Sequence, residues 1–231
     1  MEEAVTRQTE EFLESVYRLQ ERDGVARTSE LVRMLKVVPG TVTNTVERLE
    51  KKGLVLHETY KGVALTEKGR KIALRTLRRH RLSERLLTDV LNMKWNQVHE
   101  AACRLEHGVT EDIAKNIEKT LGWPRTCPHG NPIPTMCGGV IDEGSEPLLG
   151  LKPGQIGVVT RITDEKKSTL EDIERLGLKP GAHIEVLQMT AAEGPVTARI
   201  DRSDQTLSRK IASVIMVKTL HRDPDMSRGE T

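Results

Sequence analysis

The chain has 231 residues, of which 36% are hydrophobic, 30% charged and 2% aromatic, and its formal net charge at pH 7 is +2. This length suits one large domain or two to three small ones, and the scarcity of aromatic side chains argues against a surface that stacks single-stranded bases. No apolar run reaches the roughly 18 residues of a membrane span, the acidic N-terminus is unlike a signal peptide, and three cysteines are too few for a disulfide framework, which together predict a cytoplasmic protein with no membrane partner.

The first 65 residues predict three helices followed by a β-hairpin. Apolar residues recur at helical spacing before Gly24, and a Thr-Ser cap signal opens the next helix. Pro39 breaks the chain before the third helix, which Gly53 ends. Helix, turn, helix and hairpin make a winged helix-turn-helix. The predicted helices are 9–22, 28–35 and 41–52, and the predicted strands are 54–60 and 62–66.

The rest of the chain predicts a helical region and then a small β domain. Pro, Gly and Cys are frequent in 123–147, which reads as a connecting loop. Beyond residue 148, short β-rich runs alternate with Gly/Pro turns, which is typical of a small antiparallel barrel. The fold class is therefore mainly α with a small β domain. The predicted helices are 66–91, 95–107, 110–121 and 169–177, and the predicted strands are 156–162, 183–189, 196–200 and 212–217.

A basic stretch and a polar helix start indicate a DNA partner. Residues 48–85 hold twelve Lys/Arg and four Asp/Glu, a local excess that suits a phosphate backbone, although a solvated helix can also be lysine-rich. The second helix of a helix-turn-helix reads bases with its first turn, where Asn44 can pair with adenine. An ordinary exposed polar role for Asn44 stays open. The predicted DNA contacts are Arg27, Pro39, Gly40, Thr41, Thr43, Asn44, Arg48, Lys51 and Lys61.

Imidazole, thiolate and carboxylate side chains gather at helical spacing between residues 78 and 108. Two of them stand four positions apart, and four more follow at spacings of four, three and one, which places each group on one side of a helix. The first pair alone is also common as a surface ion pair. Such a donor mixture suits a first-row transition metal. Together with the predicted DNA-binding region, it predicts a metal-sensing protein that binds DNA. The side chains are His80, Glu84, His99, Cys103, Glu106 and His107.

Several sequence runs resemble the diphtheria-toxin-repressor family of metal-activated transcriptional repressors. The runs are TVTNTVERLEKKGLV, GVALTEKG, RRHRLSERLLTDV, VHEAACRLEH and PHGNPIP. The resemblance covers roughly residues 5–135, and LGLKPGAHIEV more loosely resembles the SH3-like domain of the iron-responsive branch. It implies four parts: a winged helix-turn-helix DNA-binding domain at 1–73, a helical metal-binding and dimerisation domain with its connecting loop at 74–145, an SH3-like domain at 146–222, and a flexible tail at 223–231.

The resemblance implies two metal sites per subunit. An ancillary site would use His80, Glu84 and His99, and a regulatory site would use Cys103, Glu106 and His107 with a side chain from the first helix. Glu11 stands where iron sensors carry methionine and manganese sensors a carboxylate. Glu14 matches a second carboxylate of the manganese sensors, yet Cys103 follows the iron pattern.

This mixture leads us to expect Fe(II), with Mn(II) as the alternative. Thiolate favours softer ions and carboxylates favour harder ones, and Fe(II) tolerates both. In the iron branch the SH3-like domain adds a Glu and a Gln, but Lys166 and Thr169 stand at those positions here. Glu165 and Glu171 are the nearby substitutes. Cys127, His129 and Cys137 are predicted to be structural, with a further metal site as the weaker alternative, and Trp95 and Trp123 are predicted core anchors.

The expected function is a homodimeric, metal-dependent repressor of metal uptake or storage genes that binds a double-stranded DNA operator and is not an enzyme. Alternatives are a manganese-selective regulator, a winged-helix regulator that senses a small organic ligand, and a metal-dependent hydrolase. A hydrolase would need an open coordination position and a nearby acid or base, and the sequence holds no HExxH or nucleophile motif.

Overall fold

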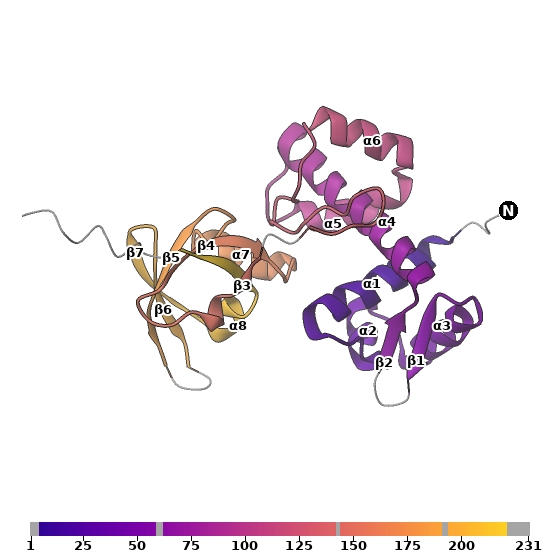
Figure 1. The fold of residues 1–231 in the computed structure, drawn as a ribbon, viewed down its shortest axis with the longest axis horizontal. Helices are drawn as coiled ribbons and strands as arrows, with labels where there is room; N and C mark the ends of the chain where they lie inside the picture. The colour runs from indigo at the N-terminus through magenta and orange to yellow at the C-terminus, as the bar shows by residue number, and fades with distance from the viewer. Residues whose placement is uncertain (1–4, 59–61, 142–143, 191–193, 221–231) are drawn as a thin grey trace, which may run out of the picture. The chain divides into compact units, whose positions relative to one another are not determined.

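The computed structural model describes residues 5–58, 62–141, 144–190 and 194–220, and the chain divides into two compact units (Figure 1). Lys61 and the predicted tail 223–231 lie outside the described residues. No helix in the described part is long and apolar enough to cross a membrane. Unit 1 comprises Met1–Leu86, Ala101–Arg125 and Ile133–Ile141, and unit 2 comprises Leu87–Glu100, Thr126–Pro132 and Asp142–Thr231. Both units draw on the predicted helical region 74–145.

Unit 1 begins with the predicted winged helix-turn-helix. The Thr6 hydroxyl accepts a hydrogen bond from the Thr9 N–H at the start of the first helix, and Gly24 ends it with a φ of +74°. The third helix begins two residues earlier than predicted, because proline suits the first turn of a helix. The elements are α1 (Arg7–Asp23), α2 (Thr28–Leu35), α3 (Pro39–Lys51), β1 (Val55–Glu58) and β2 (Gly62–Leu65), with β1 and β2 antiparallel.

The helical region departs from the predicted helices at their ends. The predicted helix 66–91 is α-helical only to Arg85, and one π-helical turn follows. The last residues of the predicted helix 95–107 form a 3₁₀ turn, which is tighter than an α-helix. The elements are α4 (Glu67–Arg85), η1 (Leu86–Val90), α5 (Val98–Leu105), η2 (Glu106–Gly108) and α6 (Glu111–Thr120).

A buried ion pair fixes α4 against α6 in unit 1. Arg78 is only 3% exposed, and its two Nη atoms donate to both carboxylate oxygens of Glu118 at 2.9 and 2.6 Å. Nη1 also donates to the Pro134 carbonyl at 2.9 Å. Such a two-pronged pair is directional, so it sets how α4 lies against α6. The residues of α4 that follow Arg78 carry the candidate ligands.

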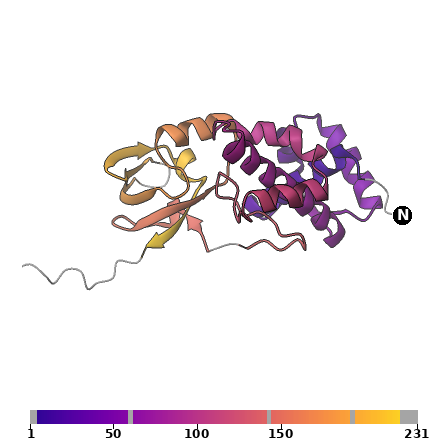
Figure 2. The ribbon, with the colours of Figure 1, turned by 90° about the horizontal axis from the view of Figure 1, so that it is seen from above.

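Most of unit 2 is a six-stranded antiparallel sheet with the short helices α7 and α8, which confirms the predicted small β domain. The strand order is β3-β8-β4-β5-β6-β7, and α7 packs over the sheet with Leu170 and Ile173 in the core (Figure 2). Strands β3 and β7 were not predicted, because one has two residues and the other is mostly polar. The elements are β3 (Glu146–Pro147), η3 (Leu148–Gly150), β4 (Ile156–Ile162), α7 (Lys167–Arg175), β5 (His183–Met189), β6 (Val196–Ile200), β7 (Ser203–Leu207), α8 (Arg209–Ala212) and β8 (Ile215–Leu220).

The loop Thr126–Pro132 lies against the end of β4 inside unit 2. The Ile162 N–H donates to the His129 carbonyl at 2.9 Å. Gly130 has a φ of +84°, and a Cβ there would stand 1.9 Å from the Thr160 carbonyl oxygen, so only glycine fits. Trp95 packs against the core of this unit, as predicted, and its indole N–H donates to the Pro128 carbonyl at 2.8 Å.

Candidate metal centres

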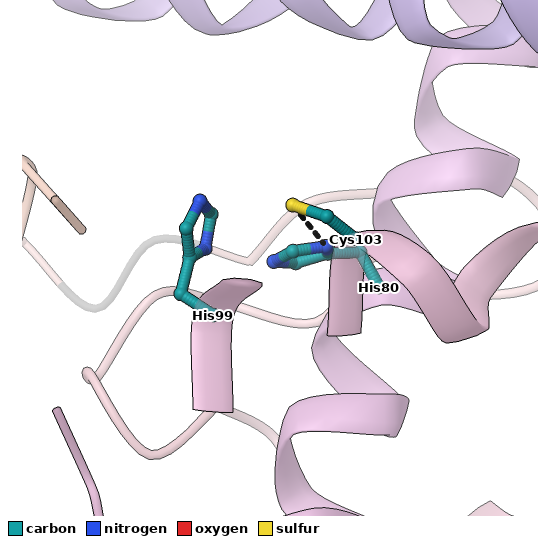
Figure 3. Close-up of side chains that lie close together, drawn as sticks. All are labelled: His80, His99 and Cys103. Carbon is teal, nitrogen blue, oxygen red and sulfur yellow. Dashed lines mark hydrogen bonds between the residues drawn. The ribbon is translucent and has the colours of Figure 1, made fainter. Parts of the chain in front are cut away.

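His80 lies at the middle of a buried polar group in unit 1, and its side chain is 0% exposed. Its Nδ1 is 2.6 Å from Glu106 Oε2, and its Nε2 is 3.0 Å from Glu84 Oε1. The Cys103 sulfur is 3.9 Å from Nδ1, and the dashed line in Figure 3 marks this contact. Both ring nitrogens therefore face acidic side chains. We call the group around His80 the carboxylate cluster, whose members are Glu10, Glu11, Glu14, His80, Glu84, Cys103, Glu106 and His107.

Helix α1 brings carboxylates to this cluster. Ligand atoms of Glu14, His80 and Glu106 all lie within 4.8 Å of one another. Glu14 is 6% exposed and Glu106 is 3% exposed, so neither carboxylate is well hydrated. Arg18 donates to Glu14 at 2.8 Å. The cluster thus joins α1 to α4 and to the turn η2.

His107 makes a second junction between η2 and α1. Its Nδ1 is 2.9 Å from Glu10 Oε2, and its Nε2 is 3.3 Å from Glu11 Oε1 and 3.2 Å from Glu106 Oε1. Nε2 is buried, yet among the described residues it has no hydrogen-bond partner. Arg79 of α4 pairs with the other oxygen of Glu10 at 2.5 Å. Sequence reasoning missed Glu10, although its place one turn before Glu14 was the available signal.

The electrostatics of the cluster favour a cation. Burial opposes the charged form of His80, but the Glu84 carboxylate and hydrogen bonds to Cys103 and Glu106 outweigh it and raise the His80 pKa well above its ordinary value. Burial, and then the charge of Glu14, raise the pKa of Glu106. Carboxylates that repel one another in a buried site are stabilised by a metal ion.

The donor set of the carboxylate cluster fits a divalent first-row ion. It offers several carboxylates, two imidazoles and one thiolate, and the orphaned Nε2 of His107 points toward two of the acids. Oxygen and nitrogen donors suit Mn(II) and Fe(II), and a single thiolate is compatible with Fe(II). The cluster brings His80 and Glu84 together with residues that the sequence assigned to the other site.

Within unit 2, His99 faces a carboxylate. Its Nδ1 is 3.2 Å from Glu165 Oε2. Lys166, one of the aligned third-domain positions, has an exposed side chain, and Thr169, the other, donates its hydroxyl to Asp164 at 3.0 Å. Glu165, weighed as a substitute from the sequence, is the carboxylate that faces His99.

A second polar group, which we call the thiol cluster, lies in unit 2 and comprises Cys127, His129 and Glu165. Their ligand atoms lie within 4.8 Å of one another, and all three side chains are at least nine-tenths buried. Glu165 Oε1 is 3.9 Å from the Cys127 sulfur and 3.6 Å from His129 Nδ1. The sequence favoured structural roles for Cys127 and His129. Their Cys-x-His spacing was a signal for a site, but the partner carboxylate lies far along the chain.

The predicted DNA-reading turn lies on the surface of unit 1. Val42, Val46 and Leu49 are buried as predicted, and the polar residues between them face outward. The Thr43 hydroxyl donates to the Pro39 carbonyl at 3.3 Å. The described candidates for DNA contact are all exposed: Arg27, Pro39, Gly40, Thr41, Thr43, Asn44, Arg48 and Lys51.

Comparison with known families accounts for most of the chain. Residues 4–63 match the family described as "Iron dependent repressor, N-terminal DNA binding domain". Residues 66–135 match "Iron dependent repressor, metal binding and dimerisation domain", and residues 146–219 match the "FeoA domain". The three matches follow one another along the chain in the order that the fold suggests.

Individual relatives extend over nearly the whole length. The iron-dependent repressor IdeR of Mycobacterium tuberculosis is 35% identical over 225 residues, 91% of this chain and 96% of the relative. The diphtheria toxin repressor of Corynebacterium diphtheriae is 28% identical over 225 residues, 92% of this chain and 97% of that one.

Solved structures give the same likeness. A manganese-dependent transcriptional repressor in complex with manganese has a TM-score of 0.86 at 30% identity and covers 92% of this chain and 100% of its own. The IdeR of T. acidophilum has a TM-score of 0.81 at 29% identity and covers 93% and 98%. The similar proteins thus include both iron-dependent and manganese-dependent repressors.

Proposed function

Because the chain belongs to the iron-dependent repressor family, whose members are transcriptional repressors and not enzymes, we propose that it represses genes of metal uptake or storage when a divalent ion binds. The observation that carries this proposal is the carboxylate cluster. It gathers candidate ligands from α1, from α4 and from the segment 103–107, in the same unit as the DNA-reading helix α3. The protein would act in the cytoplasm as a homodimer on a DNA operator.

The carboxylate cluster provides a physical route from ion to DNA. Glu11 and Glu14 on α1 would hold the ion together with Cys103, Glu106 and His107. A bound divalent ion would supply the positive charge that lets the buried carboxylates of Glu14 and Glu106 stay ionised side by side. Helix α1 shares a core with Val42 and Val46 of α3, so the position of α1 is transmitted to the DNA-reading helix.

The dimer makes the response selective. Two recognition helices meet two half-sites about one helical turn apart only at the right spacing. A two-state arrangement is biased by whatever binds one state more tightly, so an ion that prefers the DNA-competent form acts as the activator. The dimerisation domain matched in residues 66–135 is the region that would pair the two copies.

We propose Fe(II) as the ion, with Mn(II) as the second candidate. Cys103 adds a soft donor to a set otherwise made of carboxylates and imidazoles, and Fe(II) accepts both kinds. The carboxylates of α1 favour a harder ion and keep Mn(II) open. Intrinsic affinity follows the Irving–Williams order, so geometry and cellular supply must select against Ni, Cu and Zn.

We further propose two sites per subunit, the second at the thiol cluster. The ancillary set of His80, Glu84 and His99 stays a prediction. Within unit 2, Cys127, His129 and Glu165 supply a candidate donor set, and His99 contacts the same glutamate. Thiolate, imidazole and carboxylate together suit Fe(II), Co(II) or Zn(II).

Operator binding under controlled metal supply tests the proposal. We expect tight binding to a labelled promoter fragment with Fe(II) under anaerobic conditions or with Mn(II), and loss of binding when a chelator is added. Equal binding after chelation would reject metal activation and would favour the regulator that senses an organic ligand. The variant Glu100→Ala, an exposed position of α5, is the control and should respond like the native chain.

A further inference from the structure

Two groups outside the donor set hold the thiol cluster in place. We infer that the Trp95 carbonyl and the Asn131 side-chain amide are positioning groups, which decide that His129 presents Nδ1 and that Glu165 presents its Oε1 edge to a bound ion. This inference rests on the proposed second site. All of the contacts that carry it lie inside unit 2.

The Trp95 carbonyl decides which nitrogen of His129 carries a proton. His129 Nε2 is 3.1 Å from that carbonyl oxygen, which can only accept a hydrogen bond, so Nε2 must be the donor. The ligand nitrogen is therefore Nδ1, which faces the Cys127 sulfur at 4.0 Å and Glu165 Oε1 at 3.6 Å. A ligand histidine is commonly oriented in this way through its second nitrogen.

Trp95 is itself held firmly, so its carbonyl is a fixed point. Its indole N–H donates to the Pro128 carbonyl, and its ring meets the His129 ring edge-on with centroids 4.9 Å apart. The Lys179 ammonium lies 5.3 Å from the centre of the indole ring. Aromatic contact, hydrogen bond and cation–π contact restrain the residue from three sides.

Asn131 plays the matching part for Glu165. Its Nδ2 donates to Glu165 Oε1 at 2.8 Å and to the Ile162 carbonyl at 2.8 Å, which uses both of its hydrogens. The bond to Ile162 anchors the amide on β4, and the bond to Oε1 turns that oxygen toward Cys127 and His129. The other oxygen is left on the side of His99.

The backbone of the loop makes this arrangement rigid. The Cys127 N–H donates to the Asn131 carbonyl at 2.8 Å, and the Gly130 N–H donates to the Cys127 carbonyl at 2.9 Å. Asn131 is 7% exposed and His129 is 0% exposed, so water competes little for these hydrogen bonds. A donor set fixed before the ion arrives binds it with less reorganisation.

Cobalt binding to the full chain tests the role of Asn131. In a Cys103→Ser, Cys137→Ser background, only Cys127 can give a thiolate-to-cobalt charge-transfer band. We expect Asn131→Leu, which removes the amide at similar size, to weaken Co(II) binding followed by this band by about 10- to 100-fold. Asn96→Leu is the matched control, because the Asn96 amide donates to Glu174 at 2.7 Å, a residue outside the cluster.

Histidine tautomers test the role of Trp95 without any variant. In ¹⁵N-histidine-labelled protein we expect His129 to keep its proton on Nε2 both without metal and with Zn(II), while only the Nδ1 signal shifts on Zn(II) binding. A shift of Nε2 with a proton on Nδ1 would overturn the inference, and this readout stands even if Asn131→Leu fails to fold.

The cobalt measurements distinguish an absent second site from a second site that does not depend on Asn131. If the background protein gives no cobalt band that Cys127→Ser abolishes, the second site itself is wrong. If that band is present but Asn131→Leu binds Co(II) as tightly as Asn96→Leu, the site stands and the positioning role of Asn131 is wrong.

Discussion

The carboxylate cluster takes its side chains from α1, α4 and the segment 103–107, whereas two of the three thiol-cluster residues sit on one loop that is hydrogen-bonded to β4. In the first case the donors meet only when separate helices are correctly placed, so the proposed ion binding would be coupled to helix position. In the second case the loop backbone already fixes two donors. A site assembled from movable parts suits a sensor, and a site built on a fixed loop suits a permanent ion.

The largest effect should come from Glu106, which belongs to both junctions of the carboxylate cluster. Glu106→Ala removes the partner of His80 Nδ1 and a neighbour of His107. We expect metal-activated operator binding to fall on the order of 100-fold, since loss of a ligand or its partner commonly costs that much affinity. Fluorescence anisotropy with a labelled operator measures it. Retained metal activation in Glu106→Ala would contradict the assignment of metal sensing to the carboxylate cluster.

A smaller and more selective effect is expected at the thiol cluster. Cys127→Ser should weaken binding of Co(II) or Zn(II) by roughly 10- to 100-fold, because thiolate prefers such ions, and should leave Mn(II)-activated operator binding nearly unchanged. Calorimetric titration measures the first and anisotropy the second. Cys137→Ser, at an exposed cysteine, is the control. If Cys127→Ser abolished Mn(II) activation, the thiol cluster would be part of the sensor.

The pH dependence should separate the clusters further. The raised pKa of His80 means that the folded metal-free chain holds this proton more tightly than the unfolded chain does. Its contribution to stability is therefore present at low pH and is lost as pH rises through the raised pKa.

Metal binding has the opposite sign, because the ion needs Glu106 without its proton and is repelled by the positive charge of a protonated His80 beside that carboxylate. We expect the increase in Tm caused by Mn(II) to grow with pH through the pKa of His80, and to vanish at acidic pH as Glu106, whose pKa is also raised, takes up its proton. Thermal melts across pH with and without Mn(II) measure it. A Mn(II) effect independent of pH would place the ion away from these two residues.

The smallest effect concerns DNA and should leave both clusters untouched. Lys51→Ala removes an exposed charge at the end of α3 and should lower the log–log salt slope of operator binding by about 0.9, with metal affinity unchanged. Lys119→Ala, an exposed lysine on α6, is the control and should keep the native slope. An equal change in both variants would mean that the slope reports overall charge, and not a contact of α3.

Local signals in the sequence predicted the first three helices within two residues, because breakers such as Gly24 and Pro39 act within one turn. The π turn after Arg85 and the 3₁₀ turn at Glu106 were not predictable in this way. Their hydrogen bonding depends on what packs around them. Trp123 was expected in the core, yet it is 62% exposed with a φ of +61°, since the chain turns sharply away after α6.

The candidate site residues also divide into those that local spacing groups and those that only tertiary packing brings together. Helical spacing gathered His80, Glu84, Cys103, Glu106 and His107 correctly as neighbours in the carboxylate cluster, although their roles as ligands stay a proposal. Helical spacing had no means of pairing Cys127 with Glu165, 38 positions away, because only the packing of the loop on β4 brings them together. Lys61 lies outside the described residues and its predicted DNA contact stays a prediction.

The short turn η2 lets two adjacent residues serve different neighbours. Consecutive side chains diverge by about 100° around an α-helix and by about 120° around a 3₁₀ helix. Glu106 thus reaches inward to α4 while His107 reaches sideways to Glu10 of α1. The 3₁₀ turn thus lets two adjacent residues contact two different helices, α4 through Glu106 and α1 through His107. Unwinding of that turn would break both contacts at once.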